Sequence, residues 1–386
     1  MNLLLSEGHL QLREEVAKFA QQHIAPFAAE FDRRGPQKYC SELMAKVAQK
    51  GWLGICFPKE YDGLGKDFTS YVIVTEEISK GYEAMGPNCQ GNLVAAHSIY
   101  RFGTEEQKQK YLKPLARGEH IGAFSLAEAN AGSDAAGLET EYVLEGDSYV
   151  ITGRKRFISN ATVARTYLLF ARARGSRGHQ GVSAFIVEKG TPGFSFGKID
   201  EYIGAYGHLT GELIFKNCRV PKGNLLGEEG NGFVIAMSTL EIGRTGECAQ
   251  ALAVSENCLK VAAGYAQTRV QFGKPIADFQ AIRFMLADMG TEIEAARLLV
   301  YHAARLIDLG YKATKESSMA KLYASDIAMR CANKAVSILG ARGLTKEYPV
   351  ERYFRTAKMF EVVVGTAEVQ RTVIGREVLK QFKQEK

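Results

Sequence analysis

The sequence of 386 residues lacks the features that mark several classes of protein. Its seven cysteines stand singly, without a C-x-x-C pair, and its seven histidines are scattered, so we expect neither a disulfide framework nor a metal site. No stretch of about 18 apolar residues occurs, so no transmembrane helix is expected. The apolar run at residues 3–5 is too short for a signal peptide. These absences favour a soluble, cytoplasmic protein.

The charge and the apolar content indicate which ligands and how many subdomains to expect. The net charge is +6, but basic and acidic residues are interspersed and no basic block occurs, so nucleic-acid binding is not expected. The positive balance suits an anionic ligand, and a mixed solvated surface is the simpler account of it. An apolar content of 46% over this length permits two or three packed subdomains.

The chain divides into three stretches, which together predict an α+β fold. Residues 1–120 favour helices, because Leu12, Val16 and Ala20 recur at helical spacing. Thr104, which is followed by two glutamates, has the pattern of a helix start. Residues 226–386 favour long helices joined by short loops, which is typical of an antiparallel bundle.

The middle stretch, residues 121–225, has the composition of a β domain. Gly, Asn and Asp separate β-rich runs at residues 149–153, 167–171, 182–187 and 212–215. No helical pattern lies between these runs to serve as a crossover, so a barrel-like or sandwich domain is favoured over a Rossmann sheet.

Five segments carry a more specific signal. Residues 124–134 read FSLAEANAGSD, and residues 153–160 read GRKRFISN. The string RVQFGKPI begins at Arg269 and is followed by Gln280. Residues 337–343 read SILGARG, and residues 364–371 read VGTAEVQR. In this order the five segments resemble the signatures of the acyl-CoA dehydrogenase family. Ala127 stands where that family usually has threonine, and Ser337 and Ala341 stand where it has glutamine and glycine.

The resemblance implies a three-domain flavoprotein. The expected fold is an N-terminal helical domain, a middle β-barrel-like domain and a C-terminal four-helix bundle, with the cofactor FAD. The implied substrate is an acyl thioester of CoA or of acyl carrier protein. An electron-transfer partner or oxygen would take up the electrons, and the implied assembly is a homotetramer built as a dimer of dimers.

The resemblance also assigns roles to particular residues. Phe157 would lie against the flavin, Ser159 would bond near its N5 atom, and Arg269 would reach the pyrophosphate of a neighbouring subunit's FAD. The full set implied for FAD is Phe124, Leu126, Ala127, Gly132, Ser133, Phe157, Ile158, Ser159, Arg269, Gln271, Phe272, Gln280, Ser337, Ile338, Leu339, Gly340, Ala341, Thr366 and Glu368. The set implied for the substrate is Ser133, Glu241, Arg244, Val364 and Gly365.

One departure from the family affects the chemistry directly. The residue before the Gly-Thr pair is usually the glutamate that removes the α-proton of the thioester, and here it is Val364. Some relatives carry this glutamate directly before an arginine on the long helix, where this chain has Gly243. Both usual base positions therefore lack a carboxylate, although the backbone N–H of Val364 could still hold the thioester carbonyl.

Other residues offer alternatives that the sequence leaves open. Glu247 lies one helical turn after Gly243, so it is a candidate substitute base, and an ion pair with Arg244 is its alternative role. Glu361 lies before Val364, where a structural role is favoured. His208 stands in an unusual segment, residues 203–210, and could approach the rim of the site or be structural.

The leading hypothesis is an FAD-dependent oxidoreductase that acts on an acyl thioester with a substituted or displaced base. A specialised pathway such as a biosynthetic one is favoured over bulk β-oxidation. Three further reactions do not depend on a strong base: enoyl reduction, elimination and oxygenation. The alternative from another class is a catalytically silent flavoprotein.

Overall fold

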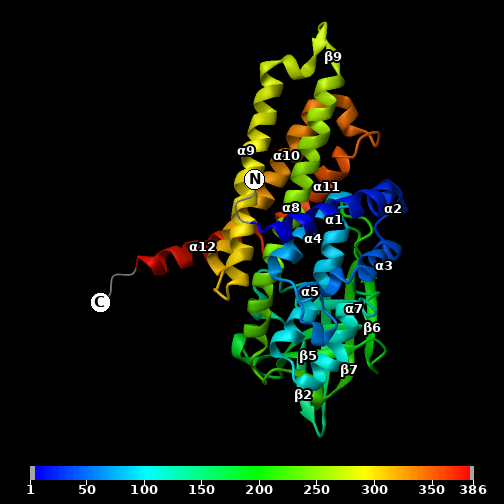
Figure 1. The fold of residues 1–386 in the computed structure, drawn as a ribbon. Coiled ribbons are helices and arrows are strands. Elements are labelled where there is room, and N and C mark those ends of the chain that lie inside the picture. The colour runs from blue at the N-terminus through cyan, green and yellow to red at the C-terminus, as the bar shows by residue number, and fades with distance from the viewer. Residues whose placement is uncertain (1–4, 383–386) are drawn as a thin grey trace.

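The computed structural model describes residues 5–382, so the apolar run at residues 3–5 lies largely outside it. The elements follow the predicted order of helices, sheet and helices, and the α+β fold is confirmed. Figure 1 shows the sheet at one end of the molecule and the long helices extending away from it. No helix in the described part is long and apolar enough to cross a membrane.

The N-terminal part is helical. Thr104 begins one of its helices with a capping box: its side chain accepts from the Gln107 N–H, and the Gln107 side chain accepts from the Thr104 N–H. The helices are α1 (Glu7–His23), α2 (Ala28–Arg34), α3 (Ser41–Gln49), α4 (Phe68–Gly81), α5 (Met85–Phe102), α6 (Glu105–Gln107) and α7 (Lys113–Arg117).

The middle part is an eight-stranded mixed sheet. Its hydrogen-bonded order is β6-β7-β3-β2-β4-β5-β8, and β1 pairs with β4. The strands are β1 (Gly122–Ser125), β2 (Glu141–Glu145), β3 (Ser148–Ser159), β4 (Thr166–Ala173), β5 (Val182–Glu188), β6 (Phe194–Ile199), β7 (Thr210–Pro221) and β8 (Leu225–Leu226). The β1–β4 and β2–β4 pairs are parallel, which the short spacing of the strands did not predict.

The C-terminal part consists of long helices and one small hairpin. The helices are α8 (Gly232–Thr268), α9 (Gln280–Asp308), α10 (Thr314–Leu339), α11 (Val350–Phe360) and α12 (Ala367–Gln381). The hairpin of β9 (Val270–Gln271) and β10 (Lys274–Pro275) joins α8 to α9 at their far end, and α12 leaves the body of the molecule (Figure 1).

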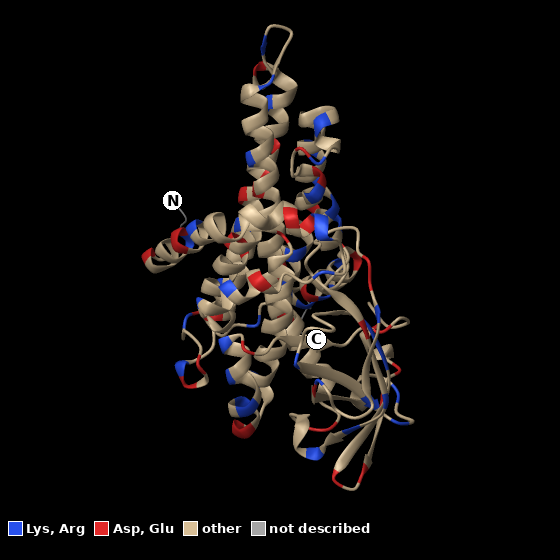
Figure 2. Cartoon of the chain, turned by 90° about the vertical axis from the view of Figure 1, so that its right-hand side faces the viewer, with Lys and Arg blue, Asp and Glu red and all other residues tan. Residues whose placement is uncertain are grey.

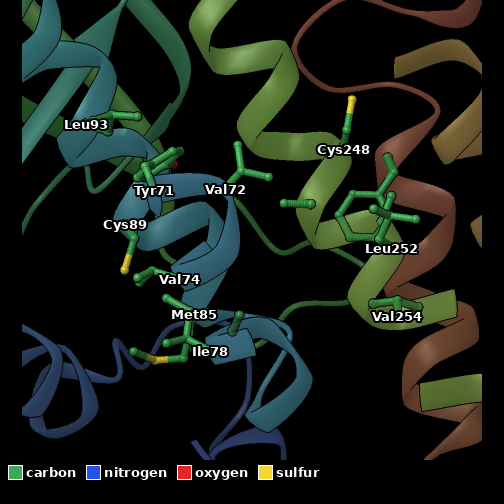
Figure 3. Packing of buried hydrophobic residues seen from close by; sticks show 14 of the residues in the cluster. Tyr71, Val72, Val74, Ile78, Met85, Cys89, Leu93, Cys248, Leu252 and Val254 are labelled. Carbon is green, nitrogen blue, oxygen red and sulfur yellow. The ribbon is translucent and has the colours of Figure 1, made fainter. Parts of the chain in front are cut away.

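Helix α8 packs closely against α4 and α5 because glycines remove side chains from the contact. A Cβ atom on Gly86 of α5 would lie 2.4 Å from Cγ of Gln250, and one on Gly246 of α8 would lie 3.0 Å from the Tyr71 hydroxyl. Figure 3 shows Tyr71 and other apolar residues of α4 and α5 lying beside α8. This contact fixes the distance between α5 and α8, which matters for the site described below.

Charged residues of both signs are spread over the helices and the sheet, as Figure 2 shows. The pattern agrees with the mixed surface expected from the sequence. Inside the protein, Glu76 of α4 is buried against Arg297 of α9, with 2.7 Å between the carboxylate and the guanidinium. Lys80 and Arg297 hold the pKa of Glu76 well below its usual range despite its burial, so the pair ties α4 to α9.

Candidate active site

The loop after β1 is fastened to β3 by a buried ion pair. The Lys155 ammonium donates to a Glu128 carboxylate oxygen at 2.6 Å and to the Leu126 carbonyl at 3.1 Å. The Arg156 N–H donates to the Ala127 carbonyl at 2.9 Å. Burial lowers the pKa of Lys155 to about 8, although the Glu128 charge opposes this shift. The backbone of Leu126 and Ala127 is thereby held beside the segment that carries Phe157.

Phe157 and Ser159 stand at the end of β3 in an unusual arrangement. Phe157 has a left-handed φ of 61° and a side chain that is 49% exposed, which is uncommon for a bulky aromatic residue. The Ser159 hydroxyl lies 3.2 Å from Nε2 of the buried His208. An exposed aromatic face next to a hydroxyl fits a flat cofactor such as a flavin. Ser125, the last residue of β1, is buried, and its hydroxyl has no partner among the described residues.

Helix α5 brings Ser159 together with both usual base positions. A Cβ atom on Gly91 of α5 would lie 3.4 Å from the Ser159 Cβ. A Cβ atom on Gly243 of α8 would lie 3.7 Å from the Gln90 amide nitrogen and 3.6 Å from Cγ1 of Val364. Ser159 and Gly243 therefore lie against neighbouring residues of α5, and Val364 lies against Gly243.

Val364 adopts a backbone conformation that its side chain disfavours. Its φ is 53°, and a β-branched residue in the left-handed region is a genuine outlier that costs on the order of 1–3 kcal/mol. The Gln370 amide donates to the carbonyls of Val364 and Gly365 at 3.4 and 3.0 Å, which holds the turn. Among the described residues, the hydrogen bonds include none donated by the Val364 N–H. This donor is therefore free to hold a ligand carbonyl.

Glu247 is the buried carboxyl nearest in sequence to this cluster. Its side chain is almost fully buried, and neither carboxyl oxygen has a hydrogen-bond partner among the described residues. Burial raises the pKa of Glu247 to about 8, and the positive charge of Lys321 on α10 opposes the shift. No ion pair with Arg244 forms, because the Arg244 guanidinium donates to the Ser318 hydroxyl at 2.8 Å and to the Leu240 carbonyl at 3.1 Å.

Glu241 and Glu361 make contacts that favour structural roles. The Glu241 carboxylate accepts from the Ala313 N–H at 2.7 Å and from the Thr314 hydroxyl at 2.8 Å, so it caps the start of α10. Glu361 pairs with Lys358 at 2.5 Å. The ligand contacts expected for Glu241, Arg244, Ser133 and Gly365 remain predictions.

The residues implied for FAD form two separate groups in one chain. Arg269, Gln271, Phe272 and Gln280 lie at the hairpin end of α8 and α9, far from the sheet (Figure 1). The C-terminal end of α10 and the turn after it carry Ser337, Ile338, Leu339, Gly340 and Ala341. Phe272 is 95% exposed and has a φ of 51°. Such exposure of a large apolar side chain is typical of a residue that packs against another subunit. The other group, which includes Phe157 and Ser159, belongs to the sheet. Within one chain the hairpin residues are therefore too far from the sheet residues to contact the same FAD.

Two further residues implied for FAD, Thr366 and Glu368, lie at the start of α12. The Thr366 side chain accepts from the Val369 N–H at 3.4 Å and so caps this helix, while Glu368 is exposed in its first turn. Both follow directly on the turn that contains Val364.

Sequence reasoning missed the polar residues of α5. Asn88, Gln90 and Asn92 are buried in a helix that is otherwise largely apolar. Buried amides need hydrogen-bond partners, so the run N-C-Q-G-N at residues 88–92 was the available signal. No group of His, Cys, Asp and Glu that could hold a metal ion occurs in residues 5–382.

The three-part fold and the exposed Phe157 beside the Ser159 hydroxyl fit a flavin-dependent oxidoreductase of acyl thioesters. Models of the N-terminal, middle and C-terminal domains of acyl-CoA dehydrogenase match residues 6–119, 123–218 and 230–379. The chain belongs to the acyl-CoA dehydrogenase family.

Similar proteins cover almost the whole chain. The short-chain specific acyl-CoA dehydrogenase of Clostridium acetobutylicum is 45% identical over 98% of this chain and 100% of its own length. The acryloyl-CoA reductase (NADH) of Anaerotignum propionicum is 43% identical, over 98% of this chain and 96% of its own. The solved structure of butyryl-CoA dehydrogenase from Megasphaera elsdenii has a TM-score of 0.95 at 42% identity, over 98% of this chain and 100% of that one.

The cofactor and reaction class follow from the family. Members are FAD-dependent, and a solved structure of PigA with FAD and proline has a TM-score of 0.94 at 27% identity, over 99% of this chain and 100% of that one. The exposed Phe157 fits such a group. The protein is an FAD-dependent oxidoreductase of the CH–CH class that acts on acyl-CoA, and the predictions of family, fold and cofactor are confirmed.

Proposed function

We propose that this protein interconverts saturated and 2,3-unsaturated acyl thioesters and that Glu247 handles the α-proton in place of residue 364. The observation that carries the proposal is the buried Glu247 carboxyl, whose two oxygens have no partner among the described residues. It lies one helical turn from Gly243, which faces Val364. A buried polar group without a partner is destabilising, and a functional role explains its presence.

The geometry of helix α8 supports this displacement of the base. Side chains on an α-helix slant toward its N-terminus, so the Glu247 side chain extends back toward the turn that contains Gly243. Gly243 carries no side chain that could occupy this space. A carboxylate at position 247 could therefore reach the same acyl pocket that a carboxylate at position 243 serves in some relatives.

The protonation state of Glu247 suits a proton donor. With a pKa raised to about 8, the carboxyl is mostly protonated at neutral pH and can deliver a proton to the α-carbon of an enoyl thioester. When bound, FAD supplies the hydride donor or acceptor for the β-carbon. In the opposite direction the ionised carboxylate would take up the α-proton. The reductase among the relatives described above makes enoyl reduction the favoured direction under neutral conditions.

The carbonyl end of the thioester is assigned to the turn at Val364. Its backbone N–H would donate to the thioester oxygen and stabilise the negative charge that develops there. This interaction depends on the backbone and not on the side chain, which accounts for the retention of a left-handed conformation at a valine.

The remaining assignments complete the proposal. CoA is the favoured carrier, and acyl carrier protein is the alternative. A similar solved structure, 48% identical, concerns an electron transferring flavoprotein, which makes such a protein the favoured electron partner over oxygen. Arg269 and the α10 end would complete the FAD site of a neighbouring subunit in a homotetramer. Free, mostly buried cysteines suit a cytoplasmic location.

Anaerobic mixing tests the reaction. The photoreduced wild-type protein should be reoxidised by short enoyl-CoA esters, and Glu247→Gln should slow this reoxidation by about 10²- to 10⁴-fold. Glu361→Gln is the matched control, since this nearby carboxylate pairs with Lys358 and should be dispensable. If no thioester changes the flavin spectrum in either direction of electron flow, the silent-flavoprotein alternative is correct.

A further inference from the structure

His208 connects helix α5 to the proposed flavin edge through two hydrogen bonds. Its Nδ1 atom lies 2.7 Å from Oδ1 of Asn88, and its Nε2 atom lies 3.2 Å from the Ser159 hydroxyl. The ring is 8% exposed. The direction of each hydrogen bond can be deduced from the groups around Asn88.

The orientation of the Asn88 amide is determined by its other contacts. Its Nδ2 atom lies 3.0 Å from the Gly207 carbonyl and 3.1 Å from Sγ of Cys40. A carbonyl oxygen only accepts, so the NH₂ group must face Gly207, and Oδ1 must face His208. An amide oxygen carries no hydrogen, so the hydrogen between Asn88 and His208 belongs to Nδ1 of the ring.

The tautomer of His208 then determines the direction of the Ser159 bond. Burial lowers the pKa of His208 to about 4, so the ring is neutral at neutral pH. A neutral ring with hydrogen on Nδ1 has a bare Nε2, which only accepts. The Ser159 O–H must therefore donate to His208, and only the lone pairs of the oxygen remain for any other group.

We propose that His208 is a positioning residue that makes Ser159 a hydrogen-bond acceptor toward FAD and thereby stabilises the reduced cofactor. The inference rests on the proposed placement of Ser159 near the flavin N5 atom. Reduced FAD carries a hydrogen on N5, whereas oxidised FAD presents a bare nitrogen there. An oxygen that can only accept pairs with the former and not with the latter. This preference raises the midpoint potential of the bound FAD, so the cofactor takes up electrons from its donor more readily.

Nitrogen NMR of the holoenzyme, labelled with ¹⁵N-histidine, tests the arrangement itself. The expected signals for His208 are a protonated Nδ1 and an unprotonated Nε2, and His208→Gln identifies them by their loss. A proton on Nε2, or a positively charged ring at neutral pH, would overturn the proposal. This readout depends on Ser159, His208 and Asn88 and not on turnover.

The flavin midpoint potential tests the consequence. His208→Phe should shift the oxidised-to-reduced equilibrium about tenfold toward the oxidised form, which is about 30 mV for a two-electron couple. His208→Gln, which can still accept from Ser159, should restore most of the potential. Ser159→Ala should lower it, and adding His208→Phe to Ser159→Ala should change nothing further. His208→Leu replaces the Phe variant if the latter does not fold.

The outcomes separate this inference from the proposed function. An unchanged potential in His208→Phe, or an equal shift in the Ser159→Ala background, would overturn the role of His208. If the wild type does not reduce enoyl thioesters but the variants show the predicted shifts in midpoint potential, the assigned reaction is refuted and the role of His208 stands. A wild-type potential that depends on both residues as described supports the inference whichever thioester is the substrate.

Discussion

At the scale of single residues, the raised pKa of Glu247 predicts how the rates of the two half-reactions depend on pH. Burial raises its pKa to about 8, so the fraction that is ionised, and able to take up a proton, increases as the pH rises through this value. The dehydrogenation half-reaction should therefore accelerate with pH, and enoyl reduction should slow. Stopped-flow flavin spectra from about pH 6 to about pH 10 measure both. Glu247→Gln should abolish this dependence, and pH profiles that are the same in the variant would contradict the assignment.

The same shift has a consequence for stability. The folded protein holds a proton on Glu247 up to about pH 8, whereas an unfolded glutamate releases it near about pH 4.3. Between these values unfolding releases a proton, so the contribution of Glu247 to stability falls as the pH rises. Glu247→Gln should thus stabilise the holoenzyme more at about pH 9 than at about pH 5. Thermal unfolding midpoints of both proteins give the comparison, and midpoints that differ equally at both pH values would refute it.

The Val364 side chain cannot accept a proton, so position 364 does not take part in removing the α-proton of the substrate. A carboxylate placed there would face Gly243 and restore the geometry usual in the family. Val364→Glu should therefore raise the rate at which saturated acyl-CoA esters reduce the flavin at about pH 7 by about tenfold, because Glu247, with its pKa raised to about 8, is mostly protonated there and only its ionised fraction can act as a base. Val362→Glu is the control, because Val362 is 58% exposed two residues away. An unchanged rate in Val364→Glu would show that Glu247 already serves this step fully.

The missing carboxylates could be predicted from the sequence, but the surroundings of Glu247 could not. Val364 and Gly243 occupy positions that the motifs fix by spacing along the chain. The burial of Glu247 depends on the contacts of α8 with α4, α5 and α10, which the chain brings together over long separations. From the sequence alone an ion pair with Arg244 was favoured over catalysis, and it fails because Arg244 bonds to Ser318 instead.

At the scale of elements, the sequence predicted best where the signal is local. The helix start at Thr104 and the long helix α8 depend on neighbouring residues, and both were expected, whereas the reciprocal bond from Gln107 was not. Helix α11 and strands β2 and β6 were not singled out. Strand β2 has a short, partly exposed pattern, and its parallel pairing with β4 depends on residues about 30 positions away.

The hairpin between α8 and α9 is the element whose proposed role in FAD binding can be tested by substitution. Its turn residue Phe272 is 95% exposed, and Arg269 lies at its base, so neither contributes to the core of this chain. Arg269→Ala should therefore lose FAD while the chain keeps its fold, as measured by flavin absorbance and circular dichroism. Lys274→Ala, in the same hairpin, is the control and should keep its flavin. Full flavin occupancy in Arg269→Ala would show that the hairpin does not serve the cofactor.

At the scale of the whole molecule, one chain supplies two halves of the proposed FAD site that do not meet. The sheet end carries Phe157 and Ser159, and the hairpin end carries Arg269 and Phe272. The family resemblance predicted this division, whereas composition and periodicity contained no sign of it. A site shared between subunits has a measurable consequence, because every FAD then depends on an intact interface.

FAD retention should therefore follow assembly in one transition. Four chains of 42.4 kDa should elute together as a holoenzyme, and dilution should release FAD at the concentration at which the assembly dissociates. The two events share a cause, because separation removes Arg269 and the α10 end from the partner's flavin. Fluorescence of released FAD and light scattering follow them in the same sample. A monomer that retains FAD would contradict the shared site and would require the contacts assigned to Arg269 to come from residues of the same chain.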